Sequence, residues 1–285
     1  MGKIRKLSNT FIDNLLEGHL KDVLEVVKAD MDLDLQIRAN YINIYYKGNS
    51  LLKLSEVDSG RYTAESHEKF TSGVPIPDLT DEASTANFLE RIPSLKENIT
   101  EHGKSSLELE YEQLIIRANN NEPRNNTEYF IVDRQYVDPK GRFDLVGFYW
   151  NLPRHRGDVV PLCLMEVKFA LNPDIGELHS QLNTYYDAMK SDFKKMASEF
   201  QGILQQKLEL RLFDQKDDRL DVMKTLTIND DINNAQFIVI LIDYNPRSKF
   251  FERARLHELP FADQVKIFRT GFGLWQTNLD IPVRV

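Results

Sequence analysis

The stretch "PLCLMEVKFA", residues 161–170, has the composition of a buried β-strand but carries two charged side chains near its end. Because side chains alternate between the faces of a strand, Glu166 and Lys168 share one face with Leu164, and the opposite face is apolar throughout. This pattern predicts a central strand. One interpretation of the charges is a solvated strand end where they pair across strands. The other is a buried site, since burying such groups is costly unless they pair or bind an ion.

A second predicted strand supplies an acid at a matching position. The segments "EYFIVDRQYVD" (128–138) and "RFDLVGFYW" (142–150) flank the turn "PKG" and predict a hairpin. Alternation places Asp144 on the face of Val146 and Phe148, so Asp144, Glu166 and Lys168 are expected to meet at one end of adjacent strands. Two carboxylates, a backbone carbonyl and water suit Mg²⁺ or Mn²⁺, and an adjacent lysine can hold a water or stabilise charge on a phosphate.

The rest of the chain predicts an α/β protein. Apolar residues at helical spacing predict helices over 9–29, 105–121 and 175–210. Residues 34–57 predict a β-hairpin with a turn at 47–49, and 235–245 predict a strongly apolar strand. Residues 58–101 are expected to form a surface connection with a short helix near 83–99, and residues 248–275 helix and irregular structure.

Composition limits the class of protein. The 285 residues carry a formal charge of −8 and a single cysteine, Cys163. A lone cysteine excludes an internal disulfide or a thiolate zinc site and suits a reducing compartment. No signal-like or membrane-spanning apolar run is evident, so a cytoplasmic protein without membrane contact is expected. The acidic balance argues against a general nucleic-acid coat protein.

Together these segments resemble the PD-(D/E)xK nuclease superfamily, which has the restriction-endonuclease-like fold. The resemblance covers about residues 105–245 and lies in three segments: "LELEYEQLI" (107–115), "GRFDLVGF" (141–148) and "LMEVKFA" (164–170). In addition, "QLNTY" (181–185) is similar to the QxxxY element of the RecB-type branch, and at i and i+4 its Gln181 and Tyr185 share a helix face. The sequence departs from the pattern at Phe143, where the motif has proline.

The resemblance implies roles for individual residues. Asp144 and Glu166 would be metal ligands, joined by the backbone carbonyl of Val167. Lys168 would orient or deprotonate the attacking water, which requires partial desolvation to lower its pKa. Gln181 would join the catalytic group.

Other positions are less determined by the pattern. Glu112 is chosen as the helix acid, with Glu108 and Glu110 left open. Arg142 and Tyr185 are candidate substrate contacts, although Tyr185 also fits core packing. The loop residues 154–156 are further candidates for phosphate contacts.

The resemblance also implies a fold and an activity. The expected fold is a restriction-endonuclease-like core over 101–285, a central mixed β-sheet flanked by helices, with an N-terminal helix and hairpin extension over 1–100. The expected activity is Mg²⁺- or Mn²⁺-dependent hydrolysis of DNA, in prokaryotic defence or mobile-element biology. Alternatives are an RNA nuclease, or a non-catalytic nucleic-acid-binding or assembly protein on the same fold. Residues 1–100 are a candidate surface for a second copy or a protein partner.

Overall fold

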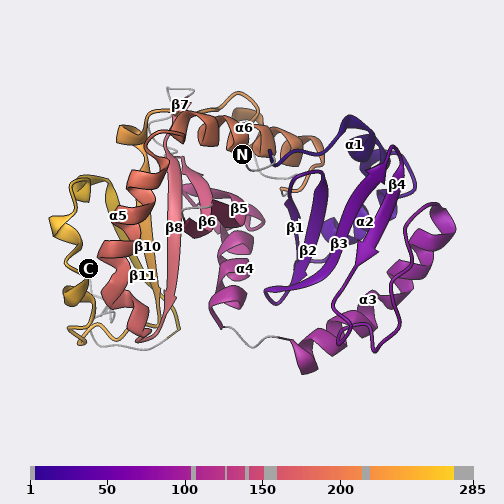
Figure 1. Cartoon of the computed structure of the whole chain (residues 1–285), viewed down its shortest axis with the longest axis horizontal. Helices are drawn as coiled ribbons and strands as arrows, with labels where there is room; N and C mark the ends of the chain where they lie inside the picture. The colour runs from indigo at the N-terminus through magenta and orange to yellow at the C-terminus, as the bar shows by residue number, and fades with distance from the viewer. Residues whose placement is uncertain are drawn as a thin grey trace, which may run out of the picture.

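The computed structural model describes residues 4–103, 107–125, 127–138, 141–150, 159–213 and 219–272. In these ranges the chain is an α/β protein, with a five-stranded mixed sheet flanked by helices and a separate four-stranded antiparallel sheet. Figure 1 shows the two sheets in two parts of the molecule, with one helix, α6, extending across the top of the view from one part to the other.

The N-terminal part pairs its four strands in sequence order. Its elements are α1 (Asn9–Leu16), α2 (Lys21–Ala29), β1 (Leu33–Ile37), β2 (Tyr41–Tyr46), β3 (Asn49–Asp58), β4 (Arg61–Glu65) and α3 (Glu82–His102). The single helix predicted over 9–29 is wrong, because the chain turns between α1 and α2. At that turn a Cβ atom on Gly18 would lie 2.8 Å from the Cα atom of Asn14, too close for any larger residue unless the backbone shifts.

The predicted hairpin is confirmed, and it belongs to a larger sheet. Lys47 and Gly48 have φ of 46° and 72°, the positive values that a two-residue hairpin turn between twisted strands requires. The expectation of a loose connection over 58–101 is wrong in part. This segment forms β4 and the 21-residue helix α3, which begins with a capping box between Asp81 and Ser84.

The C-terminal part contains the predicted strands. Its principal elements are α4 (Leu107–Asn120), β5 (Tyr129–Asp138), β6 (Gly141–Tyr149), β8 (Leu162–Phe169), α5 (Leu178–Met189), α6 (Phe193–Glu209), β10 (Gln236–Ile242) and β11 (Val265–Thr270). Shorter elements are β7 (Val159–Val160), α7 (Leu220–Met223) and β9 (Thr227–Ile228), besides single 3₁₀ turns. The long helix predicted over 175–210 is two helices, and residues 265–270 form a strand that the sequence did not indicate.

The five-stranded sheet has the order β11-β10-β8-β6-β5. Strands β5, β6 and β8 are antiparallel, whereas β8, β10 and β11 are parallel. The central strand β8 is buried on both faces. Its Cys163 and Met165 lie in a small apolar cluster with Ile116 of α4, whereas Leu164 lies in the large core with Leu182 of α5. The mixed sheet and the central position of β8 confirm the sequence predictions.

The two parts share one hydrophobic core, since the large cluster runs from Leu7 to Phe261. Polar contacts reinforce it. Gln206 of α6 exchanges two 3.0 Å hydrogen bonds with the backbone of Leu7. Arg38, which follows β1, pairs with the buried Asp133 of β5. Among the described helices, none combines the length and apolar character needed to cross a bilayer.

Candidate active site

Charged side chains lie where the pairing between β6 and β8 ends. Backbone pairing between these strands ends at Leu145 and Met165. Asp144 precedes Leu145 on β6, and its side chain replaces the backbone as the partner of β8. Its Oδ2 accepts a hydrogen bond from the Val167 N–H at 2.9 Å. The sheet geometry therefore holds Asp144 directly beside the charged end of β8.

Glu166 and Lys168 are both buried, with only 3% and 6% of each residue exposed. Lys168 Nζ donates to Glu166 Oε1 at 2.6 Å, and Gln181 Nε2 of α5 donates to the same oxygen at 2.6 Å. The other oxygen, Glu166 Oε2, is buried and accepts no hydrogen bond from any residue that the structure describes. A buried carboxylate oxygen without a donor is well suited to bind a cation.

The pKa values of the two carboxylates, Asp144 and Glu166, also favour binding of a cation. Burial, followed by the nearby Asp144 carboxylate, raises the pKa of Glu166 to about 7. Burial also raises the pKa of Asp144, against the opposing effects of the Val167 amide, Lys168 and Arg142. Two carboxylates that hinder each other's ionisation would both be stabilised as anions by a shared divalent cation. The residues present therefore fit Mg²⁺ or Mn²⁺.

The protein supplies few side-chain ligands for such an ion. Over the described ranges, no group of three or more His, Cys, Asp or Glu side chains is placed to hold a metal. The ligands would therefore be the two carboxylates, backbone oxygen and water, a set typical of Mg²⁺. Participation of the Val167 carbonyl stays a prediction.

The pKa of Lys168 is raised, whereas the expected role in deprotonating water requires a lowered pKa. Burial disfavours its charged form, but Glu166 and then Asp144 outweigh burial and raise the pKa of Lys168 above its ordinary value. Lys168 is therefore a buried ammonium group in the metal-free protein. This suits it to donate hydrogen bonds to a water or a phosphate oxygen, whereas removing a proton from water would require the neutral amine.

The helix acid that approaches this site is Glu108. Its Oε1 accepts a hydrogen bond from Asn172 Nδ2 at 2.7 Å and from the Phe169 N–H at 3.3 Å, at the end of β8. The Glu108 carboxylate also contributes to the raised pKa values of Asp144 and Lys168. The sequence left Glu108 open as an alternative helix acid, whereas Asn172 was not identified from it.

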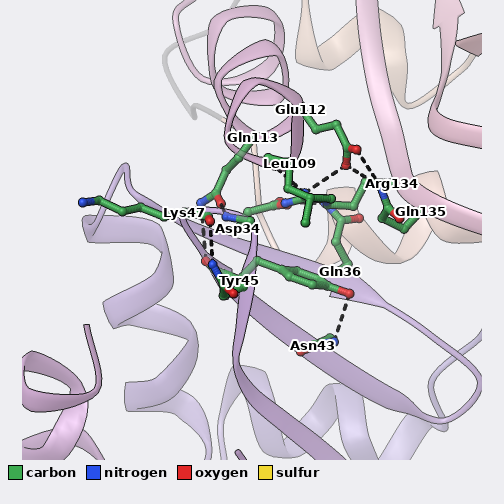
Figure 2. A network of polar contacts seen from close by, with 12 residues as sticks. Asp34, Gln36, Asn43, Tyr45, Lys47, Leu109, Glu112, Gln113, Arg134 and Gln135 are labelled. Atoms are coloured by element: carbon green, nitrogen blue, oxygen red, sulfur yellow. Dashed lines mark hydrogen bonds and ion pairs between the residues drawn. The ribbon is translucent and has the colours of Figure 1, made fainter. Parts of the chain in front are cut away.

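Glu112, the acid chosen from the sequence, is engaged elsewhere (Figure 2). Its carboxylate accepts hydrogen bonds from Arg134 Nη2 at 2.9 Å and from Gln135 Nε2 at 2.6 and 2.7 Å. Burial raises the pKa of Glu112 to about 7. Arg134 opposes this shift and the Asp144 carboxylate adds to it, so Glu112 still interacts electrostatically with the candidate site. These contacts pair Glu112 with Arg134 of β5, and its predicted role as the helix acid stays a prediction. The arginine in "DRQ" (133–135) was the available signal, because a buried arginine requires an acidic partner.

The remaining predicted residues surround the carboxylates. Gln181 Nε2 also donates to the Tyr185 hydroxyl at 2.9 Å. The Tyr185 ring packs edge-on against Phe143, with centroids 4.6 Å apart, and covers Gly141. Tyr185 therefore combines packing with support of Gln181. Arg142 is largely exposed beside Asp144, with Nη2 3.4 Å from Oδ1. The loop candidates at 154–156 lie outside the described residues.

The raised pKa of Glu166 predicts a dependence of stability on pH. Its folded value of about 7 lies above the ordinary 4.5, so ionisation opposes folding. The favourable contribution is therefore complete below about pH 4.5 and is lost as the pH rises through about 7. In chelator, the stability of the wild type relative to Glu166→Gln should fall over this range by at most about 3 kcal/mol, measured by urea denaturation.

Divalent metal should reverse this trend. Because the cation binds the ionised carboxylates, Mn²⁺ should raise the melting temperature of the wild type more at pH 8 than at pH 6. Glu166→Gln should lose most of this metal-dependent increase. An equal increase in the variant would show that the ion binds at another place.

Comparisons of the chain with protein-family models, with curated proteins and with solved structures find no match.

Proposed function

We propose that this chain is a metal-dependent nuclease that hydrolyses DNA phosphodiester bonds, built on a restriction-endonuclease-like fold of the PD-(D/E)xK kind. The observation that carries the proposal is the buried group of Asp144, Glu166 and Lys168 at one end of β6 and β8, with one Glu166 oxygen lacking a donor among the described residues. The order of α4, the antiparallel β5, β6 and β8, helices, and the parallel β10 supports the fold assignment.

The side chains of the site can act as follows. Asp144 and Glu166 would hold a divalent cation, which supplies positive charge to the scissile phosphate and lowers the pKa of a bound water. The Lys168 ammonium would donate a hydrogen bond to the attacking water or to a phosphate oxygen, where charge develops in the transition state. Gln181 fixes the orientation of Glu166 through a 2.6 Å hydrogen bond. Arg142, which is exposed beside Asp144, would contact a flanking phosphate.

A cleavage assay tests the proposal. Wild-type protein is incubated with linear duplex, circular duplex and single-stranded DNA and with RNA, in Mg²⁺, Mn²⁺ or chelator. We expect cleavage of DNA only with metal, declining with added salt because the overall acidic chain depends on local phosphate contacts. Circular substrate distinguishes internal cutting from attack at ends.

Glu166→Gln, prepared in parallel, is the control for contaminating nucleases. It removes one anionic ligand at nearly unchanged volume and should reduce cleavage to the level found in chelator. Equal activity in this variant, or cleavage that persists in chelator, would refute the proposal. Cleavage of RNA but not of DNA would change the proposed substrate to RNA and leave the proposed metal-dependent hydrolysis unchanged.

A further inference from the structure

A cavity of about 240 Å³ lies between the two parts of the molecule, away from the candidate active site. Its walls come from α2 and β1 of the N-terminal part and from α4 and the end of α6 of the C-terminal part. Leu33, Leu35 and Ile116 contribute apolar lining. The other described lining residues include Gln113, Asn120 and several charged side chains, so the cavity is about as polar as it is apolar. A concave space of this kind suits a small molecule that has both an apolar and a polar part.

Two buried charged residues line this cavity, Asp34 of β1 and Lys207 of α6. Gln36 connects them, because Lys207 Nζ donates to Gln36 Oε1 at 2.9 Å and Gln36 Nε2 donates to Asp34 Oδ1 at 2.6 Å. Figure 2 shows Asp34 and Gln36 in the polar network below α4.

Asp34 and Lys207 do not make all the hydrogen bonds of which their side chains are capable. Asp34 Oδ2 is buried and accepts no hydrogen bond from the described part of the chain, although Arg134 Nη1 forms an ion pair with it at 3.6 Å. Lys207, only 4% exposed, makes no ion pair with the described residues and uses one donor of three. Burial lowers the pKa of Lys207 to about 8, against the attraction of Asp34 and Asp133. A buried ammonium group in this setting would be stabilised by an anion.

The lining is also rich in cations. Among the described residues that line it, Lys28, Arg117 and Arg211 accompany Lys207, and Asp34 is the one acid. Lys28 pairs with Glu25 at 2.8 Å and Arg117 with Asp32 at 3.3 Å, so these two are partly neutralised. Arg211 is exposed and has no ion-pair partner in the described ranges. In a chain of net charge −8, this local excess of positive charge favours an anionic ligand.

We propose that this cavity binds a small organic anion with an apolar body and a carboxylate or phosphate group. The apolar body would lie against Leu33, Leu35 and Ile116, and the anionic group would contact Lys207 and Arg211. A hydroxyl or amine on the ligand could also donate to Asp34 Oδ2. The site is independent of the proposed nuclease activity. It nevertheless touches the same helix, because α4 contributes Ile116 to the cavity and Glu108 to the candidate active site.

Calorimetric titration with simple probes tests this site. Phenyl phosphate and benzoate, in buffer at pH 7 with chelator, represent the two anionic groups on an apolar ring. At least one should bind saturably, and at least tenfold more tightly than benzyl alcohol, which lacks the charge, and inorganic phosphate, which lacks the ring. The probe that binds identifies the preferred group. If neither binds, the proposal is overturned.

Variants locate the binding. Lys207→Met and Arg211→Ala should each weaken binding about tenfold or more, because each removes a charged donor. Arg211 is exposed, so its variant should fold normally even if the substitution of Lys207 perturbs the core. Lys195→Met, at an exposed position of the same helix, and Glu166→Gln, in the candidate active site, should bind as the wild type does. Unchanged binding in both cavity variants, or equal loss in Glu166→Gln, would overturn the assignment.

Discussion

Replacing Lys168 with methionine should lower the rate of metal-dependent cleavage by about 10²- to 10⁴-fold. The variant keeps the length of the side chain but removes the buried ammonium group, the only cationic group that the structure places on Glu166 within the described residues. The cost falls on the transition state, where charge develops on the phosphate oxygens, and less on substrate binding. Single-turnover cleavage at saturating protein and metal measures this loss directly.

The same variant should keep its metal site. Asp144 and Glu166 remain, and loss of the neighbouring positive charge favours a divalent cation there. The increase in melting temperature with Mn²⁺ should therefore equal or exceed that of the wild type. Lys195→Met should cleave at the wild-type rate. Unimpaired cleavage by Lys168→Met would exclude Lys168 from the chemistry, even if the metal dependence were confirmed.

Asp133→Asn should destabilise the fold by about 3–5 kcal/mol, the usual cost of breaking a buried ion pair. Asp133 is fully buried on β5, and its two carboxylate oxygens pair with Arg38 and Arg5. Burial opposes the charge of Arg38, but Asp133 raises the pKa of its guanidinium above the ordinary value. Asparagine preserves the volume and leaves two buried or partly buried arginines without a counterion. Urea denaturation measures the loss.

Asp58→Asn is the matched control. Asp58 makes an equally direct contact, with Arg61 Nη2 2.6 Å from Oδ2, but both side chains are mostly exposed. Exposed ion pairs contribute about 0–1 kcal/mol, so this variant should change stability by no more than that. Similar losses in the two variants would mean that burial does not govern the strength of the Asp133 contacts.

The strands around the site could be predicted because their burial is regular. Strands β5, β6, β8 and β10 are rich in buried apolar residues, and the sequence identified each of them. Strand β11 could not be identified in this way, since Lys266 to Thr270 are exposed on both faces and show no alternation of burial. The sequence predicts a single helix in place of α1 and α2 because the helical spacing of apolar residues continues across the turn at Gly18.

The proximity of Asp144, Glu166 and Lys168 could be predicted from the sequence, whereas the position of the helix acid could not. Alternation in β6 and β8 was sufficient to bring Asp144, Glu166 and Lys168 together, because strand periodicity fixes the face. On helix α4, periodicity shows only on which side of the helix an acid lies, and Glu108 and Glu112 lie on the same side. Which acid reaches the site depends on position along the helix axis, and that is set by tertiary contacts such as Arg134 with Glu112.

The ion pairs of Asp133 also restrict how this protein could have changed during evolution. The acid belongs to the five-stranded sheet, whereas its partners Arg5 and Arg38 come from the N-terminal segment and from the end of β1. Recombination that exchanged either part for an unrelated one would separate an acid from its two bases and bury charge without compensation. The two sheets are therefore expected to have been inherited together, as a single unit of descent.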